Sequence, residues 1–384
     1  MDQIYQNLDD NNYAIGIYLD LQKAFDTVNH KILLDKLYNY GFRGTVLHWF
    51  ESYLCNRQQF TVVNGHESCL HGVHCGVPQG SILGPLLFLL YVNNIKCVIG
   101  EDKLKLFADD TSIFLFGFDL NSLVAQANQD LQNLHEWFTA NKLSLSIGKT
   151  YYSVFAPRNT PTVIPTKLTI SGLEIKKEKC CKYLGVMLDD CLDWNNHISY
   201  VCTKLLKLTS LFYKIRSNLT TECRKALYFA MVYPHLNYAI ELYGNATVKN
   251  LKPLQTLQNK LLRILQLKSP HNPTNLLYLD YRTFKLRELH ELNVFKLIHK
   301  IIHHPADLPE TYQNYLTYNH DIHTYETRHR HDIFVHNINA NVGSKSLKFK
   351  SHRLWNNLPD HLKEVDSTSS FCNQLITLLN SRYM

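Results

Sequence analysis

The sequence predicts an α+β region of about 190 residues followed by an all-α region. Short runs rich in β-branched and aromatic residues, separated by turn residues, occur before residue 190, and long patterns with apolar residues three or four apart dominate after it. The charge changes at the same place: residues 1–192 hold 16 Lys and Arg against 19 Asp and Glu, whereas residues 193–384 hold 24 against 14. Formal charges of −3 and +10 are consistent with a polyanionic partner, although charge alone slightly favours an ordinary solvated lysine-rich surface.

Composition limits the class of protein. Hydrophobic residues make up 45% of the 384 residues and aromatic residues 12%, which is enough for a core, excludes wholesale disorder and indicates two or three domains. The apolar stretch 82–92 is about half as long as a membrane helix, so no membrane partner is expected. The first thirty residues are polar and acidic, and the ten cysteines show neither CxxC pairs nor zinc-ligand spacing. We therefore expect an intracellular protein without structural zinc, in the nucleus or the cytoplasm.

The first half alternates short strands with helices. Asn64-Gly65 is a hairpin turn signal, and Gly41 ends a helical pattern. The expected elements up to residue 100, in order, are a strand over 14–21, helices over 30–40 and 45–55, a hairpin over 58–74 and a buried helix over 82–94. Those that follow are strands over 104–107 and 112–116, an amphipathic helix from residue 121, a strand over 151–155, and a β pair formed by 169–175 with 183–188.

Helical patterns dominate after residue 189. Their expected ranges are 197–217, 221–233, 248–267, 284–303 and 371–379. Beyond His304 the pattern weakens into sequence rich in Tyr, Asn and His, so we expect a weakly structured tail over 305–384. Domain boundaries are therefore expected near residues 190 and 304.

Three aspartates stand out by their context. Asp20 ends an otherwise apolar strand, and Asp109 and Asp110 lie at the tip of a hairpin with apolar arms. Carboxylates at such places are costly unless they are hydrated, hydrogen-bonded or bound to a cation. Each alone is a common turn or strand-end residue. Together they indicate a site for two Mg²⁺ ions, which prefer hard oxygen ligands and leave positions open for phosphate.

Five segments carry a resemblance to a known family. Asp20–Asp26, Gly76–Pro85 and Phe107–Asp110 resemble, in order and spacing, motifs A, B and C of the reverse transcriptases of non-LTR (LINE-type) retrotransposons, in particular the jockey-like group. Asn141–Thr150 and Lys182–Val186 resemble motifs D and E of the same enzymes. The region downstream of these motifs in the same enzymes resembles several further segments here. They are Trp194 with His197, residues 233–238, Tyr243–Gly244, residues 257–263, Thr327–Arg328 and residues 354–359.

The resemblance implies a right-hand polymerase that copies an RNA template into DNA from a primer 3′-hydroxyl, using deoxynucleoside triphosphates. Residues 1–190 would be the palm, an antiparallel sheet backed by helices, residues 191–304 an α-helical thumb, and residues 305–384 a C-terminal retroelement tail. Only 19 residues precede Asp20. We therefore expect the fingers to be largely missing and the chain to be an N-terminally truncated copy of such an element.

The resemblance also implies roles for individual residues. The catalytic and metal-binding set would be Asp20, Asp109 and Asp110, with the Leu21 carbonyl as a further ligand of two Mg²⁺ ions, which Mn²⁺ could replace. The nucleotide-binding set would be Phe25 beneath the sugar, Gln79, Gly80 and Lys149. Tyr183, Leu184 and Gly185 would form the primer grip. The cations expected on the nucleic-acid backbone are Lys204, Lys207, Lys214, Arg216, Lys260 and Arg263.

Each of these residues outside the aspartate set also has an ordinary explanation. Phe25 suits core packing, the Gly76–Pro85 loop suits a helix-entry turn, and a lysine on a helix is commonly a solvated surface residue.

Two other functions are consistent with the sequence. One is a catalytically inactive nucleic-acid-binding remnant, which the missing fingers and the basic half favour. The other is a metal-dependent phosphodiesterase that uses the same acids, although no residue is marked as the base for an attacking water.

Overall fold

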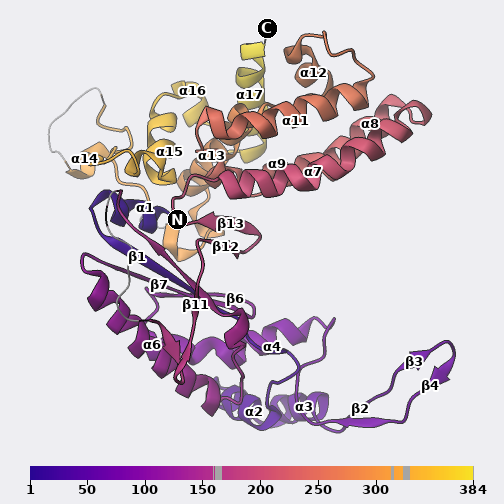
Figure 1. Cartoon of the computed structure of the whole chain (residues 1–384), viewed down its shortest axis with the longest axis vertical. Helices are drawn as coiled ribbons and strands as arrows, with labels where there is room; N and C mark the ends of the chain where they lie inside the picture. The colour runs from indigo at the N-terminus through magenta and orange to yellow at the C-terminus, as the bar shows by residue number, and fades with distance from the viewer. Residues whose placement is uncertain (159, 161–166, 313–314, 323–328, 384) are drawn as a thin grey trace. The chain divides into compact units, whose positions relative to one another are not determined.

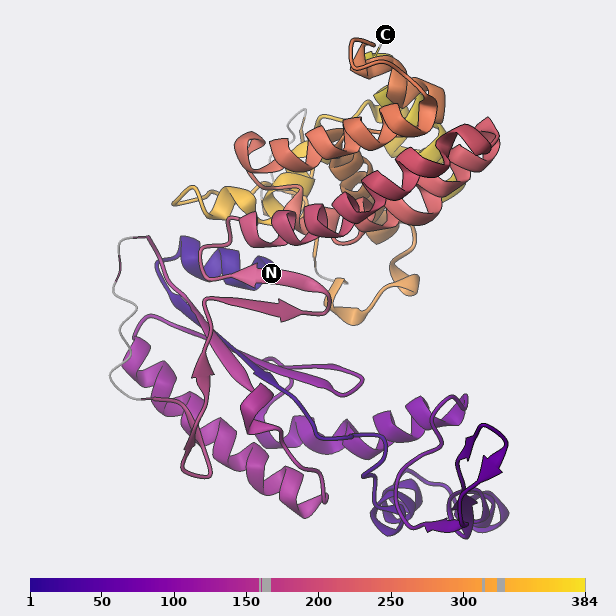
Figure 2. The same cartoon turned by 45° about the vertical axis from the view of Figure 1, so that its right-hand side comes forward.

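The computed structural model describes residues 1–158, 160, 167–312, 315–322 and 329–383. Within them the chain forms two compact units (Figures 1 and 2). We call residues 11–179 the sheet unit, and residues 1–10 together with 180–384 the helical unit. The Thr327–Arg328 segment lies outside the described residues.

A five-stranded sheet forms the centre of the sheet unit. Its strands are, in spatial order, β11 (Lys176–Lys177), β8 (Tyr151–Phe155), β1 (Tyr13–Leu19), β7 (Asp110–Gly117) and β6 (Leu104–Phe107). β1 pairs antiparallel with β7 on one side and with β8 on the other, and six of its seven residues are buried. A strand buried on both faces needs a nearly continuous apolar sequence, which is the pattern by which β1 was predicted.

Five helices share one hydrophobic core with this sheet. They are α2 (His30–Asn39), α3 (Gly44–Leu54), α4 (Leu83–Val92), α5 (Lys96–Ile99) and α6 (Leu120–Ala140). The amphipathic helix expected from residue 121 is confirmed: α6 begins at the N-cap Asp119, whose carboxylate accepts from the Ser122 N–H at 2.8 Å. Its residues Leu123, Ala127 and Leu131 are buried. Figure 1 shows α4 and α6 along one side of the sheet.

A long hairpin, which lies between α3 and α4 in the sequence, projects from the sheet unit (Figure 1). Its strands are β2 (Arg57–Gln59) paired with β5 (His71–Val73), and β3 (Val62–Val63) paired with β4 (His66–Glu67). Asn64 and Gly65 form its tip with φ of +49° and +81°. Both values suit the two-residue turn that the Asn-Gly signal predicts.

The β pairing expected between 169–175 and 183–188 is wrong. Each segment instead folds back on its own neighbour. β9 (Thr169–Ile170) pairs with β10 (Leu173–Glu174), and β12 (Cys180–Tyr183) pairs with β13 (Val186–Asp189). The physical reason is a tight turn inside each segment, because the two residues between the paired strands have positive φ in both cases: Ser171 and Gly172, and Leu184 and Gly185.

The helical unit continues from β13 into a series of helices. They are α7 (Asn195–Ile215), α8 (Thr221–Leu227), α9 (Tyr233–Asn237), α10 (Ile240–Tyr243), α11 (Val248–Gln266), α12 (Thr274–Tyr281), α13 (Leu286–His303), α14 (Asn319–Ile322), α15 (Leu347–Asn356), α16 (Asp360–Lys363) and α17 (Thr368–Asn380). The single helix expected over 221–233 is interrupted by a π-helical turn, Tyr228–Val232, which is followed by Pro234. Tyr228 and Val232 are fully buried there, so packing compensates for the irregular turn.

The first helix, α1 (Asp2–Asp9), packs with the end of the chain in the helical unit. The Asp2 carboxylate accepts from the Leu347 N–H at 2.7 Å, at the start of α15. The Asp9 carboxylate accepts from the main-chain N–H groups of Asn339 at 2.8 Å and Ala340 at 2.7 Å. Two carboxylates of α1 therefore satisfy main-chain donors that lie 330 to 345 residues away in sequence.

Replacing Asp9 by alanine is expected to lower the free energy of unfolding by about 2–4 kcal/mol, because two main-chain N–H groups lose charged acceptors. Asp9 is buried, so water does not readily replace its carboxylate. Urea unfolding followed by circular dichroism measures the change. The matched control is Asp10→Ala, since Asp10 is exposed and its side chain accepts from the Asn339 side-chain amide at 3.3 Å rather than from a main-chain N–H. Equal losses in the two variants would contradict the prediction.

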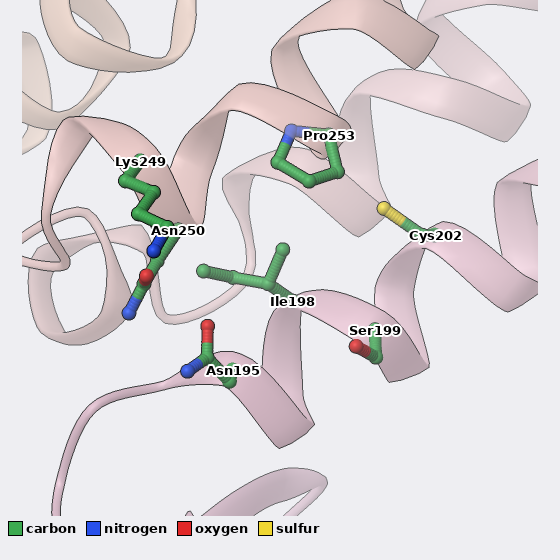
Figure 3. Close-up of a pocket in the computed structure, with 7 residues that line it drawn as sticks. All are labelled: Asn195, Ile198, Ser199, Cys202, Lys249, Asn250 and Pro253. Carbon is green, nitrogen blue, oxygen red and sulfur yellow. The ribbon is translucent and has the colours of Figure 1, made fainter.

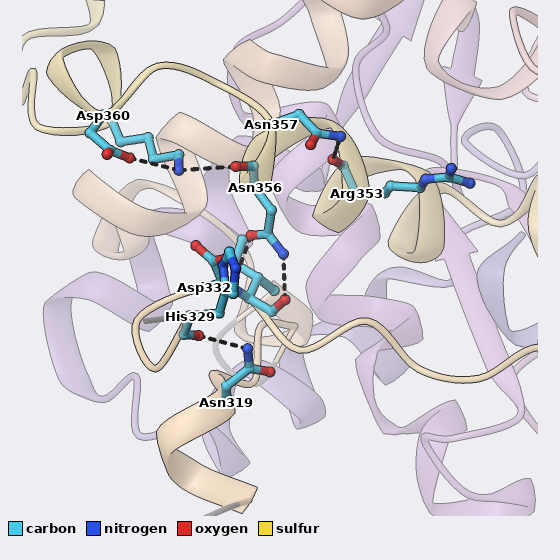
Figure 4. Close-up of polar contacts among 9 residues, drawn as sticks. Asn319, His329, Asp332, Arg353, Asn356, Asn357 and Asp360 are labelled. Atoms are coloured by element: carbon cyan, nitrogen blue, oxygen red, sulfur yellow. Dashed lines mark hydrogen bonds and ion pairs between the residues drawn. The ribbon is translucent and has the colours of Figure 1, made fainter. Parts of the chain in front are cut away.

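Side-chain amides organise the segment that follows α14 (Figure 4). Asn356 accepts from the Ile333 N–H at 2.9 Å and donates to the Ile333 carbonyl at 2.7 Å, so one side chain replaces a strand neighbour. Asn319 donates to the His329 carbonyl at 2.8 Å. The Lys363 ammonium bridges the Asp360 carboxylate at 3.0 Å and the Asn356 carbonyl at 3.1 Å.

Two further properties bear on the class of protein. Among the helices of the described residues, none combines the length and the apolar character that crossing a bilayer requires. No disulfide bond joins cysteines in the part of the chain that the structure describes.

Candidate active site

The three predicted aspartates lie at one end of the central sheet. Asp20 directly follows β1, whose last residue, Leu19, is paired with Thr111 of β7. β6 and β7 are joined by a two-residue turn of Ala108 and Asp109, because Phe107 is paired with Asp110. The register therefore brings the end of β1 beside the start of β7, and the carboxylates of Asp20, Asp109 and Asp110 share this edge.

The aspartates influence one another electrostatically. The pKa of Asp110 is raised above its ordinary value of 3.8, first by desolvation and then by the negative charges of Asp109 and Asp20. A cation among them would lower this repulsion, and carboxylate oxygens are the ligands that Mg²⁺ prefers. Over the described ranges, however, no three His, Cys, Asp or Glu side chains are arranged closely enough to hold a metal ion. The carboxylate oxygens are therefore suitable ligands for a divalent cation, but the three side chains lie farther apart than the ligands of a formed metal site.

The segment around Asp20 is held by the residues expected to form motif D. Asp20 donates from its N–H to the Thr150 hydroxyl at 3.4 Å and accepts from the Ser146 N–H at 2.8 Å through its carbonyl. Leu21 forms an isolated antiparallel bridge with Leu145. The Lys149 ammonium lies 3.6 Å from the Asp20 carboxylate. The side chain of Lys149 is 76% exposed, so it remains accessible to a ligand.

The Gly76–Pro85 loop docks on the turn that follows Asp20. The Gly76 N–H donates to the Val28 carbonyl at 2.7 Å, and the Val77 N–H donates to the Phe25 carbonyl at 2.8 Å. Gly76 has a φ of +85°, and a Cβ placed there would lie 2.8 Å from the Asp26 Cα. Only glycine allows this approach of two backbones.

Two of the predicted nucleotide-binding residues also have partners inside the sheet unit. The Gln79 amide donates to the Asp26 carboxylate at 2.7 Å. The ring of Phe25 packs against Phe88, with 4.7 Å between ring centroids, while Phe25 itself is only half-buried. Gly80 has a φ of +78°, and its α-carbon faces open space. Phe25 therefore packs against the core while part of the residue remains accessible.

The predicted primer-grip residues lie in the helical unit. Leu184 and Gly185 form the β12–β13 turn, and Tyr183 is the last residue of β12. The Tyr238 hydroxyl donates to the Leu184 carbonyl at 2.5 Å. The strained, positive φ of Leu184, a non-glycine residue, is thus supported by a hydrogen bond from the α9 region.

The predicted phosphate-contacting cations lie along two helices of the helical unit. Lys204, Lys207 and Lys214 are on α7, Arg216 follows it, and Lys260 and Arg263 are on α11. Arg216 and Arg263 are half-buried, whereas the four lysines are exposed, and the Arg263 guanidinium donates to the Asn272 carbonyl at 3.5 Å.

A pocket of about 430 Å³ lies between α7 and α11 (Figure 3). Pro253 has no N–H, so the carbonyl of Lys249 lacks the usual helical partner at this point. Asn250 donates from its side chain to the Asp193 carbonyl at 3.0 Å. The pocket is lined by one lysine together with amide, hydroxyl, thiol and apolar side chains, so its lining does not favour one class of ligand. The lining residues are Asn195, Ile198, Ser199, Cys202, Lys249, Asn250 and Pro253.

Sequence reasoning missed several residues that support these features. Asp26 ends the segment that resembles motif A, and its carboxylate accepts a hydrogen bond from the Gln79 side-chain amide. Tyr238 and His197 lay in segments that resembled the family, but no periodicity or spacing marked them as neighbours of the β12–β13 turn. Their positions depend on contacts between distant segments.

Comparison with known proteins defines the class of the first half. Residues 2–188 match the model of the family described as reverse transcriptase (RNA-dependent DNA polymerase). The chain therefore contains a reverse transcriptase domain that covers both the end of β1 and the β6–β7 turn. This confirms the resemblance to reverse transcriptases that the sequence motifs indicated.

The relatives are polymerases of non-LTR retrotransposons. The chain is 27% identical over 259 residues to the RNA-directed DNA polymerase from mobile element jockey of Drosophila melanogaster, a match of 65% of this chain and 28% of that protein. The corresponding jockey protein of Drosophila funebris is 28% identical over 261 residues, with the same coverage. The Pol polyprotein from type-1 retrotransposable element R1 of Bradysia coprophila is 26% identical over 235 residues, which are 60% of this chain and 23% of that protein.

The matches leave most of each relative uncovered, because the chain spans under a third of the length of these curated relatives. A solved structure of telomerase from Candida albicans, in complex with a fragment of telomeric RNA, is slightly similar in fold. It covers 81% of this chain and 51% of its own, with a TM-score of 0.35 and 14% sequence identity.

Proposed function

We propose that this chain is the palm and thumb of an RNA-directed DNA polymerase, which extends a DNA primer on an RNA template with deoxynucleoside triphosphates. In this proposal residues 1–190 are the palm, 191–304 the thumb and 305–384 the C-terminal tail. The observation that carries the proposal is the convergence of Asp20, Asp109 and Asp110 at one sheet edge, inside a reverse transcriptase domain.

The aspartate edge would hold two divalent cations, Mg²⁺ or its substitute Mn²⁺, through the carboxylates of Asp20, Asp109 and Asp110 and the Leu21 carbonyl. When bound, such ions neutralise the triphosphate and lower the pKa of an attacking hydroxyl. The pKa of Asp110, raised first by desolvation and then by the negative charges of Asp109 and Asp20, supports this assignment, since a bound cation would offset those charges.

The remaining residues of the sheet unit would position the nucleotide. The Lys149 ammonium, 3.6 Å from the Asp20 carboxylate, would bind a phosphate oxygen or give a proton to the departing pyrophosphate. Gln79, held by Asp26, would present the loop that contains Gly80 to the nascent base pair. The exposed face of Phe25 would lie beneath the sugar, where a ring clashes with a ribose 2′-hydroxyl and so selects deoxynucleotides.

In the helical unit, the turn of Leu184 and Gly185 with Tyr183 would hold the primer end. The cations of α7 and α11 would contact phosphates of the duplex, in contacts that are independent of sequence and sensitive to salt. The cations proposed for this role are Lys204, Lys207, Lys214, Arg216, Lys260 and Arg263.

Primer extension by the full chain tests the proposal. A labelled DNA primer annealed to RNA is expected to be extended with deoxynucleotides and Mg²⁺, and extension is expected to stop when the metal is chelated. The variant Asp109→Asn/Asp110→Asn should lose extension by at least about 10²-fold. The control Asp102→Asn removes an exposed carboxylate of the same unit and should extend like the parent protein.

Three outcomes would contradict the proposal. Extension by the double aspartate variant at the parent rate would show that these carboxylates are not catalytic. Salt-sensitive binding of an RNA–DNA hybrid without incorporation would indicate a non-catalytic binding protein. Cleavage of labelled nucleic acid in the absence of nucleotides would indicate a phosphodiesterase.

A further inference from the structure

The β3 strand of the projecting hairpin has an unpaired edge. β3 forms a two-stranded sheet with β4, and among the described residues no strand is paired with its other side. Val62 and Val63 are 55% and 63% exposed, and Phe60, just before them, is 50% exposed. In Figure 1 the hairpin extends beyond α3, away from the central sheet. Within the sheet unit an apolar strand edge is therefore accessible.

The register of the hairpin directs the main chain of Val62 toward this open edge. Thr61 and Ser68 form a hydrogen-bonded pair, because the Ser68 N–H donates to the Thr61 carbonyl at 2.9 Å. The next pair along the hairpin is Val62 with Glu67. Hydrogen-bonded and non-hydrogen-bonded pairs alternate along an antiparallel ladder, so the N–H and C=O of Val62 point away from β4. These are the groups to which a further strand can be added.

The sequence of this edge lacks the features that usually block strand addition. Residues 58–64, Gln-Gln-Phe-Thr-Val-Val-Asn, contain no charged residue and no proline. Natural proteins commonly protect an edge strand with lysine, with proline or with a covering element. Short uncharged segments rich in β-branched and aromatic residues also pair readily with copies of themselves. The edge is therefore suited to pairing with another strand.

Charge narrows the choice of partner. A nucleic-acid strand needs cations for its phosphates, and none occurs over residues 58–64. A charged peptide likewise finds no opposite charge on this edge. The other edge of the hairpin is unsuitable for self-pairing, because Glu67 directs its main chain there and two copies would bring these carboxylates together. A second β3 edge, equally neutral and apolar, is the partner that fits.

We propose that two copies of this chain associate through their β3 edges as antiparallel strands. The pairing has two-fold symmetry when Val62 of one copy lies opposite Val62 of the other, so that each N–H donates to the other carbonyl. The Cα atoms of the two valines would then be about 5.5 Å apart, with their side chains next to each other. Because so short an edge buries little surface, we expect a reversible dimer with a Kd in the micromolar range.

Sedimentation equilibrium of the full chain, over a range of concentrations, tests the proposal. A reducing agent excludes disulfide-linked dimers, since Cys69 of the hairpin is exposed. Val62→Lys is expected to weaken dimerisation by at least about tenfold, because two like charges would face each other across the two-fold axis. The matched control is His66→Lys, which adds the same charge at an exposed residue of β4, away from the pairing edge, and should dimerise like wild type.

A pair of opposite charges tests the two-fold register. Val62→Glu alone should also fail to dimerise, for the same reason as Val62→Lys. An equimolar mixture of Val62→Lys and Val62→Glu should form a heterodimer at concentrations where neither variant dimerises alone, because opposite charges then lie side by side. This recovery is expected only if Val62 lies beside Val62 of the second copy.

Three results would overturn the proposal. The wild-type chain could remain monomeric throughout the concentration range. Folded Val62→Lys protein, with unchanged thermal unfolding, could dimerise like wild type. The mixture of the two charged variants could remain monomeric.

Other occupants of the edge give different results. If wild type is monomeric and the Val62 variants lose binding of a labelled RNA–DNA hybrid, the edge binds nucleic acid instead of a second copy. The proposed polymerase function is tested separately by primer extension. A chain that dimerises through β3 but never extends a primer contradicts only the polymerase, and a chain that extends primers as a monomer at all concentrations contradicts only the dimer.

Discussion

Asp20→Asn is expected to reduce primer extension by about 10³-fold while leaving the free energy of unfolding unchanged or slightly raised. The loss corresponds to several kcal/mol of transition-state stabilisation by a bound cation that one carboxylate ligand helps to hold. Stability should not fall, because the local hydrogen bonds of Asp20 to Thr150 and Ser146 use its main chain, which the substitution preserves. Removing its charge also relieves repulsion with Asp109 and Asp110.

The same variant is expected to change the pH dependence of stability in acid. The pKa of Asp110 in the folded protein is raised above 3.8, so between 3.8 and that raised value the folded state binds more protons than the unfolded state. Stability therefore falls as the pH increases through this interval. Asp20→Asn lowers the pKa of Asp110 and should make that fall smaller.

Primer extension measures the loss of activity. Urea unfolding between pH 3.5 and 6 measures the change in the pH dependence of stability. Asp102→Asn serves as the control, since its carboxylate is exposed and lies outside the aspartate edge. The prediction is contradicted if Asp20→Asn extends primers like wild type. It is also contradicted if activity falls only as far as the protein unfolds, because the loss would then be structural.

The parts of the fold that depend on local sequence were predictable. The apolar run of β1, the periodicity of α6 and the Asn64–Gly65 turn each contain their own signal, and the structure has these elements within a few residues of the expected ranges. α11 also follows its predicted range despite Pro253, because its apolar face is buried from Leu254 to Leu265. Local propensity and packing agree in all these elements.

The parts that depend on distant contacts were not predictable from pattern. Nothing in the sequence of α1 indicates that Asp9 accepts hydrogen bonds from residues 339 and 340. The turn at Leu184 was missed because leucine rarely adopts positive φ, and the Tyr238 hydroxyl that supports it lies 54 residues away. At the candidate site, motif order predicted the aspartates, whereas the Gln79–Asp26 and Lys149–Asp20 contacts required coordinates.

Gly76→Ala is expected to destabilise the sheet unit by about 3 kcal/mol or more and to abolish primer extension. A residue with a Cβ at positive φ costs about 1–2 kcal/mol. The added Cβ would also lie 2.8 Å from both the Cα and the carbonyl oxygen of Asp26, and backbone atoms cannot rotate away as a side chain does. The loop must therefore move away from the turn that follows Asp20.

The displacement would break more than one contact, because Gly76 joins several elements. Its N–H donates to the Val28 carbonyl at 2.7 Å, and its own carbonyl accepts from His30 at 2.8 Å and Arg57 at 2.6 Å. Since the hydrogen bond from Gln79 to Asp26 lies in the same loop, its geometry should change as well. The aspartate edge and the loop would then no longer face one nucleotide together.

Gly80→Ala is the matched comparison, since Gly80 lies in the same loop with a similar φ of +78° but with nothing within 4 Å of an added Cβ. It carries only the conformational cost, so its free energy of unfolding should fall by about 1 kcal/mol. Urea unfolding of both variants measures the difference. If the two substitutions cost the same, the approach of the loop to Asp26 does not hold these segments together. A clear excess for Gly76→Ala would instead assign that cost to the contact between the two motif backbones.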